Sequence, residues 1–476
     1  MMNALKVLGD DGVRRIDAAA RSILERTGVA VPHEGVLALF RKAGAGVDPA
    51  GGRVRIPSGL IDDCLLSAGK RFTLYGRDRK MTAAFGAGRR NYNSTAGQAH
   101  WIEESGTRRF ATMEDVRRAA RLGDALPLIT VVGAMADPHE IDAATRCVEV
   151  AAALFRGTTK PVMFWFSDGP SAVHLVELIQ VIAGGEAAAY PPAHPFLEPI
   201  SPLRFPRAGL DVLFETCKIP LPVPVGPMAQ MGMSAPATVA STLAQETAEI
   251  LAGLCAVQLI GPGTPVCFGG IPHAFDMRTA QIIFGGPEQG LMAVAMTEMG
   301  KHYGLPVYIN VGLTDAKTVD AQAGLEIGSS LLAGALAGAD IFGHLGIAGA
   351  DQGASPEMLV FQHETVGYIE RILRGFEIDD ETLALDLIDR AGPGGSFIAE
   401  EHTLLHFRRE LWMPRILDRQ FHERWLEQGR RNAGDRTREL LAEVEASVVP
   451  KPLPDPVERE VAKIVEKARK RLGGSG

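Results

Sequence analysis

Short apolar runs alternate with longer amphipathic stretches through the middle of the chain. The short runs predict strands at 129–134, 161–166, 196–201, 222–226, 265–270, 306–311 and 340–345. The stretches between them predict helices, clearest at 141–156, 172–183, 235–257, 287–303 and 318–337. Strands that are apolar along their whole length are buried on both faces, as in a parallel sheet covered by helices. The pattern therefore predicts an α/β fold.

The number of strand–helix units favours a barrel over an open sheet. Seven units are present, and an eight-stranded (β/α)8 TIM-type barrel needs one more strand, which the pattern does not place. An open doubly wound sheet is the alternative, but the first strand–helix turn lacks the G-x-G-x-x-G of a dinucleotide site. Residues 1–110 predict an N-terminal α/β cap region, 111–395 the barrel and 396–476 a C-terminal helical extension.

Composition and charge narrow the class of protein. The 476 residues carry a net charge of −8 with acidic and basic residues intermixed, which argues against a nucleic-acid partner. The five cysteines form no C-x-x-C pair, so we expect reduced thiols and a cytoplasmic protein. No signal peptide or membrane span is expected, because apolar runs are short. No metal site is expected either, since His402 and His406 lack the glutamate of the zinc-protease motif.

Polar and aromatic residues gather where the predicted strands end. The strand within 306–311 leads through Asn310 to Thr314 and Asp315 and then into a helix. Strand ends are where barrel enzymes place catalytic groups, so Asn310 and Asp315 are candidate catalytic residues, although Asp315 also suits a helix cap. The candidate substrate-binding residues at strand ends are Phe164, Trp165, Phe166, Glu198, Phe268, His273, Thr314, Phe342 and His344.

This set of side chains suits an organic cation. Aromatic faces attract a quaternary ammonium group, and a nearby carboxylate adds opposite charge. Glu198 lies within an apolar strand, where a charge needs a partner. Because side chains alternate along a strand, only about half of Phe164, Trp165 and Phe166 can face the interior, and the others would be core residues.

Several segments resemble the trimethylamine methyltransferase superfamily, in the same order along the chain. They are 16–31, 201–205, 262–266, 312–324 ("GLTDAKTVDAQAG"), 381–389 and 392–419. The resemblance implies a barrel that moves a methyl group from a methylated amine to the cobalt of a separate corrinoid protein, with no cofactor held permanently by the chain itself. No pyrrolysine is present, so the chain is similar to the non-pyrrolysine members, whose characterised examples demethylate glycine betaine, carnitine or proline betaine.

The resemblance also implies what the chain need not supply. Cobalt(I) is a strong nucleophile, and a quaternary ammonium releases a neutral tertiary amine, so no proton transfer is required. The chain's tasks are then to hold the cation, align one methyl group and exclude water. The loop from Asn310 to Asp315 is expected at the open face, close to substrate and cobalt. The expected partners are a cognate corrinoid protein, a small betaine-like quaternary amine and further copies of the chain in a homo-oligomer.

Two segments depart from the family pattern. Gly349 and Ala350 stand where many relatives have glutamate and serine, and the polar groups follow at Asp351 and Gln352. These changes bear on the substrate more than on the type of reaction.

The second departure lies at 92–104, which adds Gln98 and His100 as candidate substrate-binding residues. A betaine carboxylate needs a basic or hydrogen-bonding partner, and His344, His273 and His100 are unranked candidates.

Two other functions stay open. One is a corrinoid-independent barrel lyase or hydrolase acting on a methylated amine, which needs an internal base or metal. The other is a protein that binds methylated amines without turnover.

Overall fold

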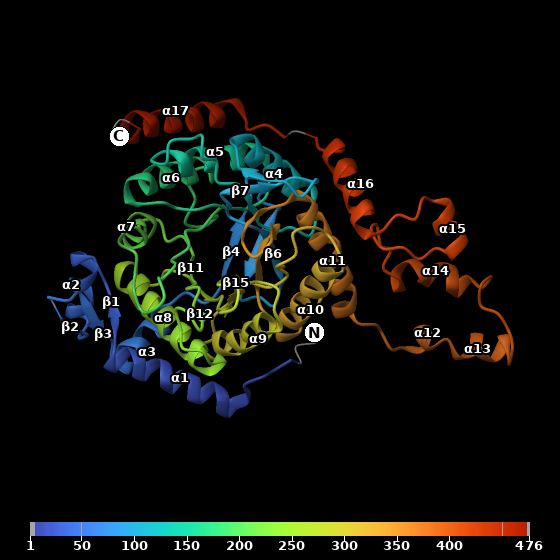
Figure 1. The fold of residues 1–476 in the computed structure, drawn as a ribbon, viewed down its shortest axis with the longest axis horizontal. Helices are drawn as coiled ribbons and strands as arrows, with labels where there is room; N and C mark the ends of the chain where they lie inside the picture. Colours follow the sequence, from blue (N-terminus) through green and yellow to red (C-terminus); the bar gives the residue numbers. More distant parts are fainter. Residues whose placement is uncertain (1–4, 49, 450, 474–476) are drawn as a thin grey trace.

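The structure is a computed structural model that describes residues 5–48, 50–449 and 451–473. Figure 1 shows a ring of helices around a central group of strands. The predicted α/β fold, with parallel strands covered by helices, is confirmed. The helices of the ring are α4 (Met113–Ala125), α5 (Arg146–Gly157), α6 (Gly169–Ile182), α7 (Arg207–Thr216), α8 (Val239–Ile260), α9 (Pro287–His302), α10 (Ala321–Ala337) and α11 (Pro356–Arg374).

Five strands form one parallel sheet. Its order is β11 (Val223–Val225), β13 (Val266–Gly270), β16 (Val307–Ile309), β17 (Ile341–Leu345) and β6 (Asn91–Ser94). The first four lie within predicted strands. β6 was not placed by the apolar pattern, because its sequence Asn-Tyr-Asn-Ser is mostly polar although all four residues are buried. It lies within the range 1–110 that we assigned to a cap, yet it is a strand of the main sheet.

Parallel pairing continues beyond this sheet. β9 (Val132–Gly133) pairs with β10 (Val162–Met163). The bridge Asn93–Val131 links β6 to the segment before β9, and the bridge Leu197–Val225 links the segment around Leu197 to β11. A 2.9 Å hydrogen bond from Val162 N to Pro192 O links β10 to the segment that leads to Leu197. The predicted strand 196–201 is reduced to two isolated bridges, Leu197–Val225 and Ile200–Arg204. Pro195 and Pro199, on either side of the first bridge, cannot donate backbone hydrogen bonds.

A hairpin covers the amino-terminal ends of the strands. β4 (Phe72–Tyr75) and β5 (Thr82–Phe85) pair in antiparallel fashion. Their apolar cluster contains Leu74, Ala83, Phe85, Val131, Met163 and Tyr308. The Asp340 carboxylate joins hairpin and sheet, because it accepts from Gly86 N at 2.7 Å and from Val307 N at 2.9 Å. The carboxyl ends of the strands are thus the face at which a site can open.

Helix α8 is a ring helix that is buried between the N-terminal helices and the strands. It is the one helix of the described chain that is long and apolar enough to cross a membrane, but 89% of its most apolar window is buried inside the protein. Thr238 caps its first turn by accepting a hydrogen bond from Ser241 N. The apolar character of α8 therefore reflects its buried position in the fold.

The N-terminal helices pack outside the ring, and small sheets lie around the strands. α1 (Gly9–Arg26) buries Ile16, Ala20 and Leu24 on one face and packs along α8. The remaining N-terminal elements are α2 (Glu34–Lys42), α3 (Ser58–Ser67), β1 (Val29–Ala30), β2 (Gly46–Asp48) and β3 (Arg53–Arg55). The small sheets comprise β7 (His100–Ile102), β8 (Arg108–Phe110), β12 (Gln230–Met231), β14 (His273–Asp276), β15 (Gln281–Ile283), β18 (Ile347–Ala348) and β19 (Gly353–Ala354).

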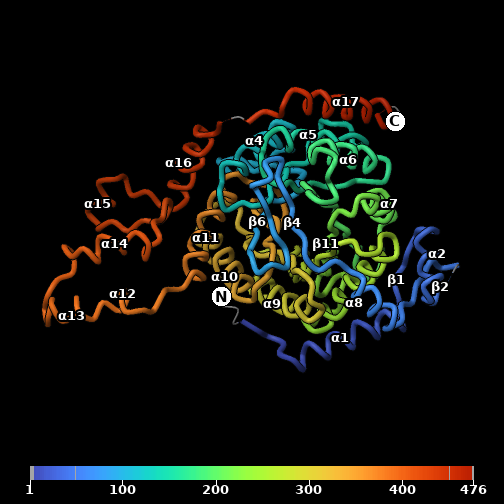
Figure 2. The backbone as a smooth tube through the Cα atoms, turned by 180° about the vertical axis from the view of Figure 1, so that it is seen from behind, coloured from blue at the N-terminus to red at the C-terminus, as the bar shows by residue number. Residues whose placement is uncertain are grey.

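After α11 the chain leaves the ring and later returns to it. Figures 1 and 2 show an arm that extends sideways from the ring. The arm, residues 376–431, contains α12 (Asp380–Leu383), α13 (Leu385–Ala391), α14 (Glu401–Glu410) and α15 (His422–Glu427). The chain then packs α16 (Ala433–Ala446) on α11 and α4, and α17 (Asp455–Leu472) on α5 and α6.

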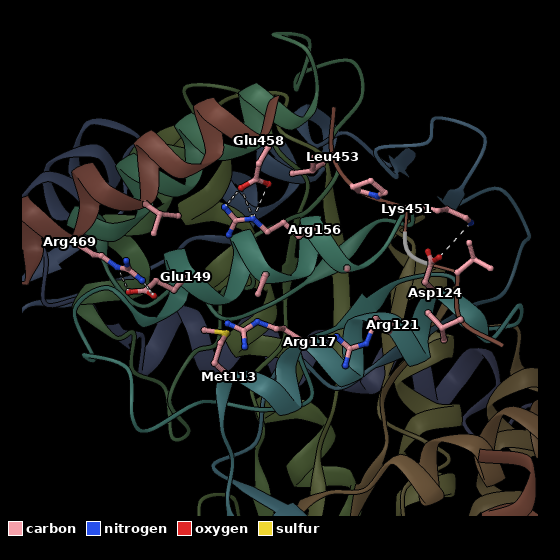
Figure 3. Close-up of a pocket in the computed structure, with 16 residues that line it drawn as sticks. Met113, Arg117, Arg121, Asp124, Glu149, Arg156, Lys451, Leu453, Glu458 and Arg469 are labelled. Carbon is pink, nitrogen blue, oxygen red and sulfur yellow. Dashed lines mark hydrogen bonds and ion pairs between the residues drawn. The ribbon is translucent and has the colours of Figure 1, made fainter. Parts of the chain in front are cut away.

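Ion pairs fasten α17 to the wall of the ring. Figure 3 shows Arg156 of α5 pointing toward Glu458, and Arg469 of α17 pointing toward Glu149. The shortest Arg156–Glu458 contact is 2.6 Å, and Arg469 Nε donates to Glu149 Oε1 at 3.0 Å. The groove they border has a volume of about 560 Å³ and lies between helices, so it is separate from the strand ends.

Candidate active site

Aromatic side chains gather at the carboxyl ends of the strands. On β16 the Tyr308 side chain packs in the interior cluster, whereas Ile309 packs among the ring helices. Met163 of β10 lies in the same interior cluster, and the partly exposed Trp165 and Phe196 pack against it. We call this place, with Tyr308 and Met163 as its floor and Trp165 and Phe196 as its walls, the recess.

Four predicted substrate-binding residues point away from the recess. They are Phe164, Phe166, Phe268 and Phe342, which pack in the clusters between strands and helices. Phe164 stacks on Phe166 with ring centroids 5.0 Å apart. The physical reason is the period of two along a strand, since Phe164 and Phe166 flank the inward Trp165. The prediction that these four bind substrate is therefore corrected, and they are core residues.

A chain of neutral hydrogen bonds crosses the floor of the recess. The His344 Nδ1–H group donates to Asn310 Oδ1 at 2.8 Å, and Tyr308 Oη lies 3.5 Å from His344 Nε2. Asn93 Nδ2 in turn donates to Tyr308 Oη at 3.3 Å. Burial lowers the pKa of His344 to about 4 and raises the pKa of Tyr308, so both are uncharged at neutral pH. The network orients these groups without adding charge.

The backbone around His344 is shaped to this network. A Cβ on Gly343 would lie 2.2 Å from Tyr308 Oη, so only glycine leaves room for the ring. His344 itself has a φ of 67°, in the left-handed region that non-glycine residues rarely adopt. Met135 and Asp351 also have positive φ values, of 55° and 65°. Such strain is concentrated at functional sites, where surrounding contacts hold it.

Two carboxylates face the recess. Glu198 and Asp351 have exposed side chains. Surrounding protein atoms desolvate the Glu198 carboxyl group, and this effect, followed by the negative charge of Asp351, raises its pKa to about 7. The same desolvation raises the pKa of Asp351 to about 6, against a hydrogen bond from Gln98. Both carboxyl groups are reached by solvent and are also partly desolvated by protein, which indicates that they lie in a concave wall. No described lysine or arginine contributes to either pKa shift.

Two of the three histidines considered for a substrate carboxylate are neutral and buried in the fold. Burial lowers the pKa of His273 to about 3, and His273 Nδ1 lies 2.8 Å from Ile271 O. Its ring packs on Phe284 with centroids 4.4 Å apart. His344 is bound into the network described above. Neither can present positive charge to a substrate at neutral pH.

His100 lies outside the recess. It is on β7 and stacks on Phe110, whose side chain is exposed, with ring centroids 4.8 Å apart. Gln98, two residues earlier, reaches Asp351 instead. Of the two residues added by this segment, only Gln98 therefore borders the recess.

Asp315 and Thr314 support loops. Asp315 Oδ1 accepts from Phe284 N at 2.9 Å, and burial raises the pKa of its carboxyl group. Thr314 Oγ1 donates to Glu326 Oε2 at 2.6 Å. The helix cap that we considered for Asp315 belongs to Asp320, which caps α10. Asn310, in contrast, meets the recess through His344.

A second cavity of about 660 Å³ lies beside Asp315. Its lining includes Arg108, Lys317, Asp315, Asp276, Ala350 and Gln352. Arg108 and Gln352 are hydrogen-bonded across it. The loop that contains Asp351 therefore borders this cavity, and two basic side chains, Arg108 and Lys317, line it.

The recess contains residues that the sequence analysis did not select as site residues. They are Asn93, Met163, Phe196, Met228, Tyr308 and Asp351. Phe196 and Tyr308 had a signal in the sequence, since each stands two positions before a selected residue on the same strand face.

Buried Glu246 fixes two loops at the strand ends. Its carboxylate accepts from Ala229 N at 3.0 Å and from Ile271 N at 2.8 Å. Burial and then the charge of Glu249 raise the pKa of Glu246 well above its usual range. The two loops follow β11 and β13, so this contact holds one side of the recess in place.

Replacing Glu246 by alanine should lower the free energy of unfolding by roughly 2–5 kcal/mol, because two buried N–H groups lose their acceptor. Urea denaturation of the purified protein measures this change. Glu466→Ala, on the exposed face of α17, is the control and should change the free energy by less than about 0.5 kcal/mol. An equally small effect of Glu246→Ala would contradict the role given to the carboxylate.

Comparison with known proteins identifies relatives over almost the whole chain. A sequence profile described as Trimethylamine methyltransferase (MTTB) matches residues 1–473. The chain is similar to a glycine betaine methyltransferase of Desulfitobacterium hafniense strain Y51, with 28% identity covering 98% of both chains. It is also similar to the trimethylamine methyltransferase MttB1 of Methanosarcina acetivorans, with 27% identity over 99% of this chain and 96% of that protein. A solved structure, the Methanosarcina barkeri monomethylamine methyltransferase, matches with 13% identity and a TM-score of 0.49, covering 98% of this chain and 94% of that one.

Proposed function

Because this chain belongs to the trimethylamine methyltransferase (MTTB) family, we propose that it transfers a methyl group from a quaternary amine to the cobalt(I) of a separate corrinoid protein. Its family membership makes the chain a methyltransferase. The quaternary amine, the corrinoid partner and the site are our proposal.

The observation that supports this proposal is the pair of uncompensated carboxylates, Glu198 and Asp351, beside aromatic side chains. Trp165 Nε1 donates to Gly97 O at 3.1 Å, so its indole ring is held in one orientation. Phe196 meets Tyr308 edge to face with centroids 5.3 Å apart. A quaternary ammonium binds to aromatic faces and opposite charge, and it needs no hydrogen-bond acceptor.

The thiol packed under the recess is not a reactive nucleophile. Cys267, in the interior cluster under the recess, is fully buried, and burial raises the pKa of its thiol well above the usual range. Its Sγ–H group points to Pro306 O at 3.2 Å, so the thiol stays protonated. An external acceptor for the methyl group fits this arrangement.

The cobalt(I) of the partner would supply the electron pair for the new carbon–metal bond. The breaking C–N bond leaves its electrons on nitrogen, so the quaternary cation becomes a neutral tertiary amine and no proton moves. As this bond breaks, the positive charge near Glu198 and Asp351 disappears, which favours product release. Trp165 and Phe196 position the remaining methyl groups, so that one methyl points to the open face.

We propose further that the strands form a closed eight-stranded barrel. The order would be β6, β9, β10, the segment around Leu197, β11, β13, β16 and β17, which returns to β6. The parallel pairs and the bridges Asn93–Val131 and Leu197–Val225 support this order. The corrinoid protein would dock over the carboxyl ends, because the β4–β5 hairpin covers the other end. Free cysteines suit the cytoplasmic location that we keep as part of this proposal.

The recess favours a substrate with net positive charge. A betaine adds a carboxylate to its ammonium group, and that carboxylate would meet Glu198 and Asp351. His344 and His273 are neutral and bonded to the protein, so they cannot offset the repulsion. A quaternary amine without a carboxylate avoids it.

One observation favours a second function. Glu198, with its pKa raised to about 7, has the acidity of a general base, as a lyase or hydrolase acting on the amine would need. Such an enzyme would give a product other than the demethylated amine and would not need cobalt.

The test combines the purified chain with its cognate corrinoid protein reduced to cobalt(I). The amines are choline, tetramethylammonium, glycine betaine, carnitine and trimethylamine. Loss of the cobalt(I) absorption together with formation of the demethylated amine, for a quaternary compound and not for trimethylamine, is the expected result. Conversion of an amine without cobalt would favour the lyase or hydrolase instead. Tight binding of an amine with no conversion would indicate a protein that binds methylated amines without turnover.

A further inference from the structure

The arm, residues 376–431, has almost no core of its own. Only Leu387 and Ile416 are buried among its residues, and α12, α14 and α15 bury none. Its helices have 4, 7, 10 and 6 residues. Helices this short do not form stably in water without packing against something.

Apolar side chains are concentrated on the arm. It holds fourteen of the 26 large apolar residues that are exposed in the described chain. Ile398 and Phe421 are each 87% exposed, Phe376 75% and Leu404 71%. Scattered apolar residues are normal on a surface, but this concentration marks a surface that another molecule covers.

The second half of the arm is anchored to α11 at Glu410 and Arg415, which limits where the arm can lie. Arg371 of α11 donates to Glu410 O at 2.9 and 2.6 Å, and Arg415 N donates to Glu364 Oε2 at 3.2 Å. Beyond it, α17 is fastened by the ion pairs of Figure 3. Figures 1 and 2 show the intervening segment extending sideways, free of the ring.

The two halves of the arm have opposite charge. Residues 376–401 contain eight acidic residues and one arginine, and residues 402–431 contain seven arginines and four acidic residues. A two-fold axis places the same surface of two copies face to face, so the acidic half of one can meet the basic half of the other. Asp386, Asp389, Arg408 and Arg419 are exposed and form no salt bridge within the described chain, although Arg419 donates to Trp412 O.

We propose that the arm is the interface for a second copy of this chain, with the acidic half of each arm against the basic half of the other. A permanent partner is required, since large apolar interfaces are typical of obligate oligomers, and transient ones are more polar. The corrinoid protein is a transient partner in the proposed reaction, and it has to reach the strand ends rather than the side of the ring. A second copy of the chain can bind permanently and can cover the side of the ring.

Analytical ultracentrifugation of the full chain tests this proposal. We expect a dimer or larger assembly at micromolar concentration, and Ile398→Asp with Phe421→Asp should raise its dissociation constant about a hundredfold or more. The control is Leu66→Asp, an 82% exposed position on α3, which should leave assembly unchanged. Equal thermal unfolding of the ring in all variants excludes misfolding as the cause. A monomeric wild type, or an arm variant that assembles normally, overturns the proposal.

Charge exchange tests the orientation. One variant carries Asp386→Lys and Asp389→Lys, and the other Arg408→Glu and Arg419→Glu. Each should assemble poorly alone, and an equimolar mixture should recover assembly, because both contacts are then complementary. Failure of the mixture to recover overturns the opposed pairing. Arm variants that assemble normally but lose binding of the corrinoid protein would assign the arm to that partner instead.

Discussion

Replacing Glu198 and Asp351 by their amides should abolish the binding of quaternary ammonium ions. Each substitution removes one negative charge from a recess that has no positive side chain to replace it. We expect each single variant, Glu198→Gln or Asp351→Asn, to lose about 10- to 100-fold in affinity, from the strength of an ion pair at reduced dielectric. The double variant should show no measurable binding. Isothermal titration calorimetry with choline provides the values.

The affinity of the wild type should rise with pH. The pKa values of about 7 for Glu198 and about 6 for Asp351 are those of the free recess, so protons compete with the cation below them. Affinity should increase from pH 5 and level off above the higher of the two pKa values. The double variant should lose this dependence.

Stability should change in the opposite direction. The folded-state pKa of Glu198 is raised above its ordinary value, so the fold loses stability as pH rises from the unfolded pKa through the folded one. Glu198→Gln removes that loss, and its thermal midpoint should exceed that of the wild type under alkaline conditions. A site that sacrifices stability for binding behaves in this way.

Asp276→Asn is the matched control for these measurements. Asp276 lies on β14, at the carboxyl side of the sheet, and is paired with Arg278 rather than with the recess. It should change neither the affinity nor its dependence on pH. Unchanged binding in Glu198→Gln and Asp351→Asn would remove the basis of the proposed substrate class.

Strand ends and alternation were sufficient to predict part of this site. Trp165, Glu198, Asn310 and His344 stand at the ends of apolar strands, and the structure brings all four to the recess or its floor. The alternation rule also predicted that only part of the aromatic trio could point inward. It could not say which, because a strand covered on both faces is apolar at every position.

The pattern of apolar and polar residues could not predict other parts of the site. Asn93 lies on β6, whose polar sequence does not resemble a buried strand, and its burial depends on neighbouring strands. Asp351 lies in a loop, and it reaches the recess through a backbone with positive φ. The direction in which the Asp351 side chain points depends on the packing of the surrounding loops, and no short stretch of sequence encodes that packing.

Choline and tetramethylammonium should bind at least about tenfold more tightly than glycine betaine, because the betaine carboxylate approaches two negative groups. All three present the same trimethylammonium group to Trp165 and Phe196, so the aromatic contribution is matched. Competition binding at about pH 8, where both acids are ionised, measures the ratio. Asp351→Asn should weaken choline more than glycine betaine and so reduce the preference.

The neighbouring cavity defines the opposite outcome. Arg108 and Lys317 line it, next to the loop that carries Asp351. If glycine betaine binds more tightly than choline, its carboxylate must reach across this loop to one of them. Arg108→Ala and Lys317→Ala would then lower the affinity for glycine betaine and leave that for choline unchanged. If choline is preferred, the same two variants should affect neither ligand, since a cation without a carboxylate has nothing to place in that cavity.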